Sequence, residues 1–143
     1  MVAYSFKQFF AAQIDAGVKR QTVRADRKRH ARPGEMLQLY TGMRTRNCQK
    51  IGPDRICIGV ERIIIERRAV EITGIEINGA RLSADEIEEF SRTDGFDPDH
   101  LKGAAGLDSH LASWNMAMFW SLNHPGDQTF EGVLIRWDAG GQA

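Results

Sequence analysis

The order of the predicted elements constrains the fold more than any other feature of this chain. A helix comes first, several strands follow, helices come next, and a last strand closes the chain. Because strands and helices do not alternate regularly, this order argues against a doubly wound parallel sheet. It favours an α+β fold in which a small mixed β-barrel carries flanking helices. We expect a single domain over residues 1–143, since this length fits one domain and no linker or repeat interrupts it.

The strands are predicted from apolar patterns and from one turn signal. Residues 56–66 form a strong strand whose centre, Ile63-Ile64-Ile65, is wholly apolar. Residues 70–77 alternate apolar and polar side chains, and Asn78-Gly79 follows them as a hairpin-turn signal. Further strands are expected at about residues 21–24, 35–40 and 129–137.

Two capping boxes and an apolar stripe predict the helices. Ser5-Phe6-Lys7-Gln8 has the capping-box pattern, and the phenylalanines that follow recur at helical spacing, which predicts a helix over about residues 6–16. A second box, Ser83-Ala84-Asp85-Glu86, predicts a short helix that ends near Ser91. A longer helix is expected over about residues 108–122, packed through Leu107, Leu111, Trp114, Met118 and Leu122.

Charge is divided unequally along a chain whose formal net charge is zero. Residues 1–70 contain 15 Lys or Arg and 6 Asp or Glu, a formal charge of +9, and residues 71–143 carry the balancing −9. Nine of the basic residues lie between Lys19 and Arg46. A protein with one cationic and one anionic side can hold a polyanion on one side only.

The cysteines and the longest uncharged segment bear on compartment and cofactor. Cys48 and Cys57 fit a protein of the reducing cytoplasm, and no further Cys or clustered His completes a metal site, so no metal or other cofactor is expected. The N-terminal residues lack the pattern of a signal peptide. Residues 109–126 have no Asp, Glu, Lys or Arg, but seven Ser, His and Asn side chains interrupt them. This pattern predicts a core helix rather than a membrane span.

Several short motifs occur in an order that is typical of one known family. After the Ala16-Gly17 helix end, Lys19, Thr22 and Arg24 form a G-x-K-x-x-T-x-R arrangement. Downstream come Pro33-Gly34-Glu35 before a strand, the acidic-Gly-Phe element Thr93-Asp94-Gly95-Phe96, and the last strand at residues 130–137. In order and spacing these motifs resemble the ASCH family, a branch of the PUA-like superfamily, over nearly the whole chain.

The resemblance implies a fold, a ligand and a chemistry. It implies a PUA-like β-barrel with a cleft between barrel and helices, and a partner that is RNA or a modified nucleoside. Some members of the family hydrolyse the amide of N4-acetylcytidine with a Lys, a Thr and a Glu, and others are reported as RNA binders or nucleases. Carried over, the catalytic residues are Lys19, Thr22 and Asp94, where Asp94 is one methylene shorter than the family's Glu.

The residues themselves permit the same chemistry. Thr22 and Arg24 are two apart, so on a strand they point to one face, and the long stem of Lys19 can reach that face from the preceding turn. An amine beside a hydroxyl is the minimum for an activated nucleophile, and burial or nearby cations would lower the pKa of the Lys19 amine. A structural interpretation stays open for each: a solvated lysine, a β-branched strand residue, and a turn-capping Asp94.

Other basic and aromatic residues are candidates for binding the ligand. Arg44 and Lys50 are candidates to hold a phosphate or an anionic intermediate, and Tyr40 to stack a base. Arg24 is a candidate ligand contact or a structural salt bridge. A run of basic residues is a candidate for phosphate contacts along RNA, with a solvated loop as the alternative; it contains Arg27, Lys28, Arg29 and Arg32.

Three functions therefore remain open at this point. The first is an amidohydrolase that acts on N4-acylated cytidine-type nucleosides in a cationic cleft. The second is a non-catalytic RNA-binding module. The third is a nuclease of single-stranded RNA, for which Asp94, Asp97 and Asp99 are the nearest carboxylates in sequence.

Overall fold

The computed structural model describes residues 2–125 and 129–139 as a mixed α+β structure built on one eight-stranded sheet. The strands are β1 (Val2–Phe6), β2 (Gln21–Ala25), β3 (Met36–Thr41), β4 (Gln49–Lys50), β5 (Arg55–Arg68), β6 (Glu71–Ile77), β7 (Ala80–Arg81) and β8 (Thr129–Trp137). The α-helices are α1 (Ala11–Asp15), α2 (Ala84–Ser91) and α3 (Ala112–Asn123). Single turns of helix occur at Gln8–Phe10, Arg92–Phe96 and Pro98–His100.

Strand β5 is the spine of the sheet. Its first residues pair with β3, most of its length pairs with β8, and its last residues pair with β6, all in antiparallel fashion. Strand β3 continues to β1 in parallel, and β8 continues to β2. Strands β1 and β2 thus lie at two edges of the sheet, and among the described residues no backbone pairing joins them. The sheet is not closed, so the predicted barrel is not confirmed.

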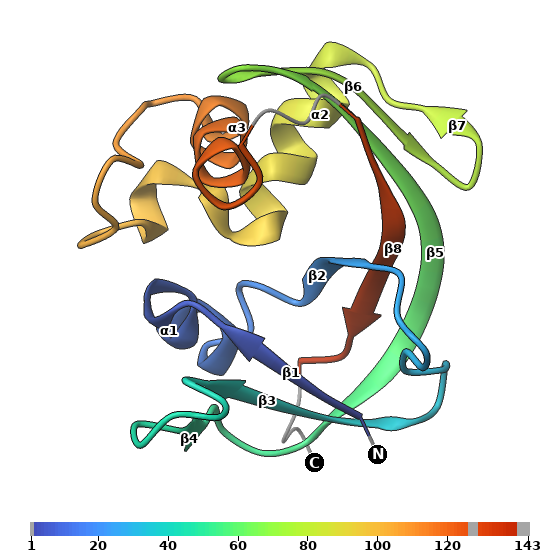
Figure 1. Ribbon diagram of the computed structural model, residues 1–143, viewed down its shortest axis with the longest axis vertical. Helices are drawn as coiled ribbons and strands as arrows, with labels where there is room; N and C mark the ends of the chain where they lie inside the picture. The colour runs from blue at the N-terminus through green and yellow to red at the C-terminus, as the bar shows by residue number, and fades with distance from the viewer. Residues whose placement is uncertain (1, 126–128, 140–143) are drawn as a thin grey trace.

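The helices lie inside the curve of the sheet. Figure 1 shows β5 and β8 bending around one side of the molecule, with α2 and α3 within the bend and α1 near β1. The buried face of β5 carries Ile63 and Ile65, which meet Ile75 of β6 and Leu134 of β8 in the core. This alternation of buried and exposed residues is the pattern expected of a strand that faces a core on one side.

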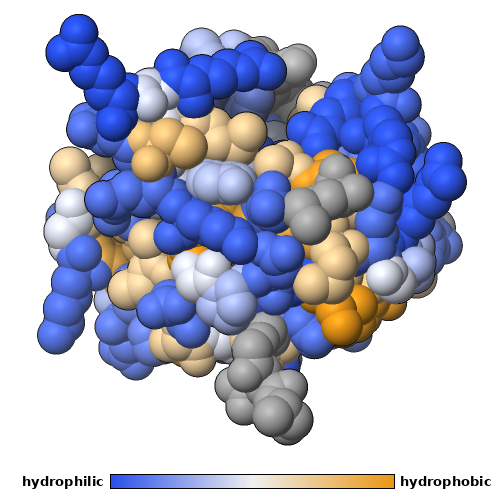
Figure 2. Space-filling model, turned by 90° about the horizontal axis from the view of Figure 1, so that it is seen from below, coloured by the Kyte–Doolittle hydropathy of each residue, from blue (hydrophilic) through white to orange (hydrophobic). Residues whose placement is uncertain are grey.

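The surface at the β3–β4 end of the molecule is mostly hydrophilic. Figure 2 shows this face, on which hydrophobic residues are exposed only in small areas between polar ones. On β3 and β5, the exposed apolar side chains include Met36, Ile56 and Ile58. None of the described helices is long and apolar enough to cross a membrane.

Several predicted elements are confirmed by the structure. The Ser83 side chain accepts a hydrogen bond from the Glu86 backbone, and the Glu86 side chain accepts one from the Ser83 backbone, so the second capping box starts α2. Asn78 and Gly79 both have positive φ angles and form the turn between β6 and β7. The closing strand runs from Thr129 to Trp137, as its pattern predicts.

The helix predicted over residues 6–16 starts later than expected: Phe6 ends strand β1, Gln8–Phe10 form a single helical turn, and α1 covers Ala11–Asp15. Val2, Tyr4 and Phe6 alternate with less buried residues and form β1, which pairs in parallel with β3. The Ser5 hydroxyl accepts a hydrogen bond from the Met43 backbone N–H and caps no helix. The pairing with β3 joins residues some 35 positions apart, so a local capping pattern could not reveal it.

The predicted helix over residues 108–122 starts later and packs through another face. Helix α3 begins at Ala112, and its buried stripe is Ala112, Met116 and Trp120. Leu111 and Leu122, which the predicted stripe contained, are exposed. The predicted stripe is wrong at Leu111 and Leu122, whereas Leu107 is buried and Met118 packs against the core. Because α3 is apolar on most sides, apolar spacing alone did not determine which side faces the core.

Candidate functional site

A cavity of about 590 Å³ opens where β1 and β2 face each other without pairing. Part of its polar lining comes from β2, from the turn that precedes β2 and from the Arg92–Phe96 turn, and consists of Lys19, Thr22, Arg24 and Asp94. Further polar lining residues are Ser5, Lys7, Asn123 and His124. Its apolar wall is aromatic and comprises Phe6, Phe10, Phe96, Phe119, Trp120 and Phe130. The cavity therefore combines a few converging polar groups with apolar walls, as small-molecule sites usually do.

Lys19 and Asp94 form a buried pair at one wall of the cavity. The Lys19 side chain is only 3% exposed, and its Nζ donates a hydrogen bond to the Asp94 backbone oxygen at 2.5 Å. The same Nζ lies 3.6 Å from Asp94 Oδ1 and 4.6 Å from the centre of the Phe10 ring. Most of the surroundings of this amine are therefore aromatic carbon rather than water.

Burial pulls both members of the pair toward their neutral forms. It lowers the pKa of the Lys19 amine, against the opposing attraction of Asp94, and the positive charge of Arg24 lowers it further. Burial likewise raises the pKa of the Asp94 carboxyl, although Lys19 and a hydrogen bond from Gln21 oppose the rise. The energy needed to move one proton from Lys19 to Asp94 is therefore much smaller than it would be in water.

Thr22 and Arg24 lie beside this pair on one face of β2. The Arg24 Nε–H donates a hydrogen bond of 3.0 Å to Thr22 Oγ1, and its Nη2 donates one of 2.6 Å to the Ser5 backbone oxygen on β1. Burial lowers the pKa of Arg24 to about 10, a value at which the group is still cationic at neutral pH. Because Arg24 occupies an acceptor site of the hydroxyl, the hydroxyl proton of Thr22 is directed elsewhere, and a negative charge that develops on Oγ1 faces a cation.

The turn that carries Asp94 is shaped by Gly95. Gly95 has a φ of 104°, and a Cβ at this position would lie 2.7 Å from Phe10 Cε1 and 3.0 Å from Lys19 Cδ. The Gln13 side chain donates to the Gly95 backbone oxygen at 3.1 Å. This glycine allows the turn to pack directly on Phe10 and on the stem of Lys19.

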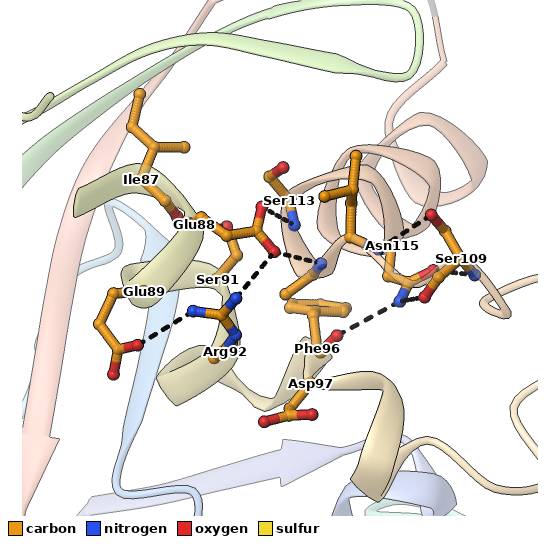
Figure 3. Close-up of polar contacts among 12 residues, drawn as sticks. Ile87, Glu88, Glu89, Ser91, Arg92, Phe96, Asp97, Ser109, Ser113 and Asn115 are labelled. Carbon is orange, nitrogen blue, oxygen red and sulfur yellow. Dashed lines mark hydrogen bonds and ion pairs between the residues drawn. The ribbon is translucent and has the colours of Figure 1, made fainter. Parts of the chain in front are cut away.

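Polar contacts from α2 and α3 support the same turn from behind. Asn115, fully buried on α3, donates to the Phe96 backbone oxygen at 3.3 Å. Figure 3 shows this bond and the Glu88 carboxylate of α2, which accepts the Ala112 and Ser113 backbone N–H groups at the start of α3. The Asp94 turn is therefore fixed to both helices rather than left as a free loop.

The other predicted substrate-binding residues lie away from the cavity. Tyr40, on β3, hydrogen-bonds to Gln38, and Lys50 forms an ion pair with Asp54. Arg44 is exposed in the β3–β4 turn and has a positive φ angle. None of Tyr40, Arg44 and Lys50 is among the described residues that line the cavity, whereas Arg24 is. The structure thus brings together one of these four candidates with the three predicted catalytic residues.

The predicted RNA-contacting residues lie in an exposed segment after β2, here named the basic loop (residues 26–35). Arg27 stacks on the Tyr4 ring at 4.5 Å and donates to the Arg29 backbone oxygen, and Arg29 pairs with Glu35. Lys28 and Arg32 are exposed side chains. The loop leaves β2 at Ala25, which lines the cavity, so its cations lie near the cavity without entering it.

Sequence reasoning missed most of the aromatic wall. Phe6 and Phe10 belong there to the helix predicted over residues 6–16, and Phe119 and Trp120 to the core helix predicted within residues 109–126. In the structure these four side chains line the cavity. The density of aromatic residues near the two ends of the chain was the available signal, but only the fold brings those ends together.

Comparison with known proteins finds no matching protein family, no similar curated protein and no similar solved structure.

Proposed function

We propose that this protein binds a nucleobase in the cavity and hydrolyses an N-acyl group from it, with N4-acylated cytidine-type nucleosides as the substrate class. The proposal is supported by a buried pair of a lysine amine and a carboxyl in an aromatic cavity that a threonine hydroxyl also lines. A lysine without a chemical role normally keeps its charged amine in water, because burial of a charge is costly. The resemblance to the ASCH family, which rests on the same three positions, supports the same chemistry.

The proposed fold is a PUA-like barrel that is open at one seam. Strands β1 and β2 are the edges of this seam, and Arg24 crosses it with its hydrogen bond to the Ser5 backbone oxygen. In such a barrel the missing strand pairing makes room for the ligand. The flat aromatic side chains of the cavity wall offer faces on which a base can stack.

The proposed first step forms an acyl-enzyme. Neutral Lys19 takes the proton of the Thr22 hydroxyl as Oγ1 bonds to the acyl carbon, and the Arg24 cation, which lines the cavity, stabilises the negative charge that moves onto the acyl oxygen. Protonated Asp94 gives its proton to the amide nitrogen as the C–N bond breaks. The free nucleoside amine leaves, and the acyl group stays on Thr22 as an ester.

The second step restores the enzyme. Lys19 then passes its proton to the Asp94 carboxylate at the same wall of the cavity, so both groups regain their neutral starting state. A water molecule then attacks the ester, with Lys19 as the base, and releases the carboxylic acid and the Thr22 hydroxyl. Over the cycle one amide and one water become one amine and one acid.

Replacement of Lys19 by methionine tests this function. Met keeps the apolar stem and removes the amine, so we expect the turnover of N4-acetylcytidine to fall by about a hundredfold or more. Lys102→Met, a change of an exposed lysine outside the cavity, is the control and should retain wild-type rates. Product formation can be followed by liquid chromatography. Equal rates for Lys19→Met and wild type would exclude Lys19 from the reaction.

A non-catalytic RNA-binding module is the alternative that one observation favours. The exposed cations of the basic loop lie next to the cavity, so a strand of RNA could place one base inside and its phosphates along the loop. This function needs no deprotonated lysine and predicts RNA binding that weakens steeply with salt. RNA binding without any hydrolysis, unchanged in Lys19→Met, would support this alternative over the enzyme.

A metal-dependent nuclease of single-stranded RNA receives less support from the geometry. Within residues 2–125 and 129–139, no three His, Cys, Asp or Glu side chains are placed to share a cation. Asp94 points to Lys19 and Gln21, while Asp97 caps the Pro98–His100 turn. Activity on single-stranded RNA that is lost when EDTA is added would support the nuclease function.

We also propose that the protein works in the cytoplasm. Cys57 is buried and Cys48 is exposed, and both are free thiols in the structure. Free thiols are usual in a reducing compartment.

A further inference from the structure

The two oxygens of the Asp94 carboxyl have different surroundings. Oδ1 accepts a hydrogen bond of 3.2 Å from Gln21 Nε2 and lies 3.6 Å from Lys19 Nζ. Oδ2 has no hydrogen-bond partner among the described residues, and the Asp94 side chain lines the cavity. One oxygen is thus held by the protein, while the other is free to face a ligand.

We propose that Gln21 is a positioning residue that holds Oδ1 of Asp94, so that the acidic proton of Asp94 is carried on Oδ2 and faces the cavity. The inference rests on the proposed function, because it concerns the same carboxyl as proton donor. Gln21 is 7% exposed and does not line the cavity, so it acts through Asp94 and does not touch the substrate.

The hydrogen bond that the Gln21 side-chain amide donates to Oδ1 explains why the proton is assigned to Oδ2 of Asp94. In a protonated carboxyl the carbonyl oxygen accepts hydrogen bonds better than the hydroxyl oxygen does. Oδ1 accepts the Gln21 N–H and is the oxygen that faces the Lys19 amine, so it is the better placed of the two to be the carbonyl oxygen. The proton therefore prefers Oδ2. Gln21 is itself fixed, since it begins β2 and its Cα is paired with that of Arg136 on β8.

Charged or titratable groups face the cavity of Asp94 from several elements, and they include Lys7, which follows β1, and His124, which follows α3. Lys19, from the turn before β2, and Arg24, from β2, are the cations that act on Asp94. Helix α3, packed on the same turn, has no charged residue between Ala112 and Asn123. The Gln21 hydrogen bond favours the carboxylate and so lowers the pKa of Asp94, against the rise caused by burial.

Removal of the Gln21 amide should change both the rate and its pH dependence. The active pair holds one mobile proton on Asp94, and loss of that proton at high pH ends activity. Without the Gln21 bond the pKa of Asp94 rises further, so the alkaline limb of the pH–rate profile should move to higher pH. The carboxyl is then also free to turn, so kcat should fall.

The experiment compares Gln21→Met with wild type and with Gln49→Met, which changes an exposed glutamine on β4. With N4-acetylcytidine as substrate, we expect Gln21→Met to lower kcat about tenfold, with KM within about twofold, and to shift the alkaline limb upward. Gln49→Met should match wild type. An unshifted limb, or a loss confined to KM, would overturn the positioning role.

A second measurement separates this inference from the proposed function. The Asp94 carboxyl carbon, assigned by comparison with Asp94→Asn, can be titrated by ¹³C NMR without any substrate. A higher midpoint in Gln21→Met supports the inference even if N4-acetylcytidine is not turned over, and an unchanged midpoint refutes it even if it is. If Gln21→Met does not fold, Gln21→Leu is a smaller apolar replacement that removes the amide donor without adding a charge, and it carries the same expectations.

Discussion

The cavity and the basic loop contain the same kinds of cationic residue, but Lys19 and Arg24 at the cavity are largely buried, whereas the cations of the loop are exposed. In the cavity, Lys19 and Arg24 are desolvated, and burial lowers the pKa of both. In the basic loop, Arg29 is half exposed and its ion pair with Glu35 lies in contact with water. Burial of a charge costs several kcal/mol, whereas an exposed ion pair contributes about 1 kcal/mol or less.

A high density of basic residues in a sequence therefore does not identify the basic residues that are buried and have shifted pKa values. The densest basic run, residues 27–32, lies mostly at the surface, while Lys19, the lysine whose pKa is lowered, lies outside that run in the turn after a helix. A perturbed pKa needs burial and a specific partner, and both are properties of the fold. Substitutions in the cavity and in the basic loop can test this contrast between the two regions.

The largest effect is expected from removal of the Thr22 hydroxyl. Thr22→Val keeps the shape and removes the proposed nucleophile, so turnover of N4-acetylcytidine should fall by about a thousandfold or more. Thr73→Val, an exposed threonine on β6, is the matched control and should retain wild-type turnover. Steady-state kinetics of the three proteins give the comparison. A small effect at Thr22 would leave the cavity as a binding site only.

A smaller effect is expected when alanine replaces a glycine in each region. Gly95, at the cavity, has φ 104° and no room for a Cβ, whereas Gly34, in the basic loop, has φ 90° and open space around it. Gly95→Ala should therefore cost about 3 kcal/mol of unfolding free energy, from strain and overpacking together. Gly34→Ala should cost about 1 kcal/mol, from strain alone. Denaturant unfolding measures both, and equal losses would contradict the tight packing on Phe10.

Local signals in the sequence predicted a good part of the fold. The Ser83 capping box, the Asn78-Gly79 turn and the closing strand each depend on residues that are near one another in the chain, and all three are confirmed. The N-terminal strand was not predictable in the same way. Its conformation is decided by parallel pairing with β3, which a local pattern does not contain.

The candidate site was predictable only in its polar half. The ASCH-like motifs identified Lys19, Thr22 and Asp94, and the structure places all three at one cavity. The aromatic half depends on where Phe119 and Trp120 of α3 meet Phe10, which is set by tertiary packing. Gln21 was missed for a related reason, since its importance lies in one contact with a residue 73 positions away.

The smallest effect is expected from substitutions in the basic loop. Lys28→Gln and Arg32→Gln each remove one exposed cation that lies outside the cavity. If RNA passes over the loop, each change should lower the slope of log binding constant against log salt by about 0.7, the value for one phosphate contact with a single strand. Each should also leave the free energy of unfolding within about 0.5 kcal/mol of wild type, since neither charge is buried.

Arg24→Gln provides the contrast, because it removes a largely buried cation that bonds both Thr22 and Ser5. This change should therefore destabilise the protein clearly. An unchanged salt slope in both loop variants would mean that phosphates do not follow this loop, and the cationic side of the molecule would then serve the cavity alone.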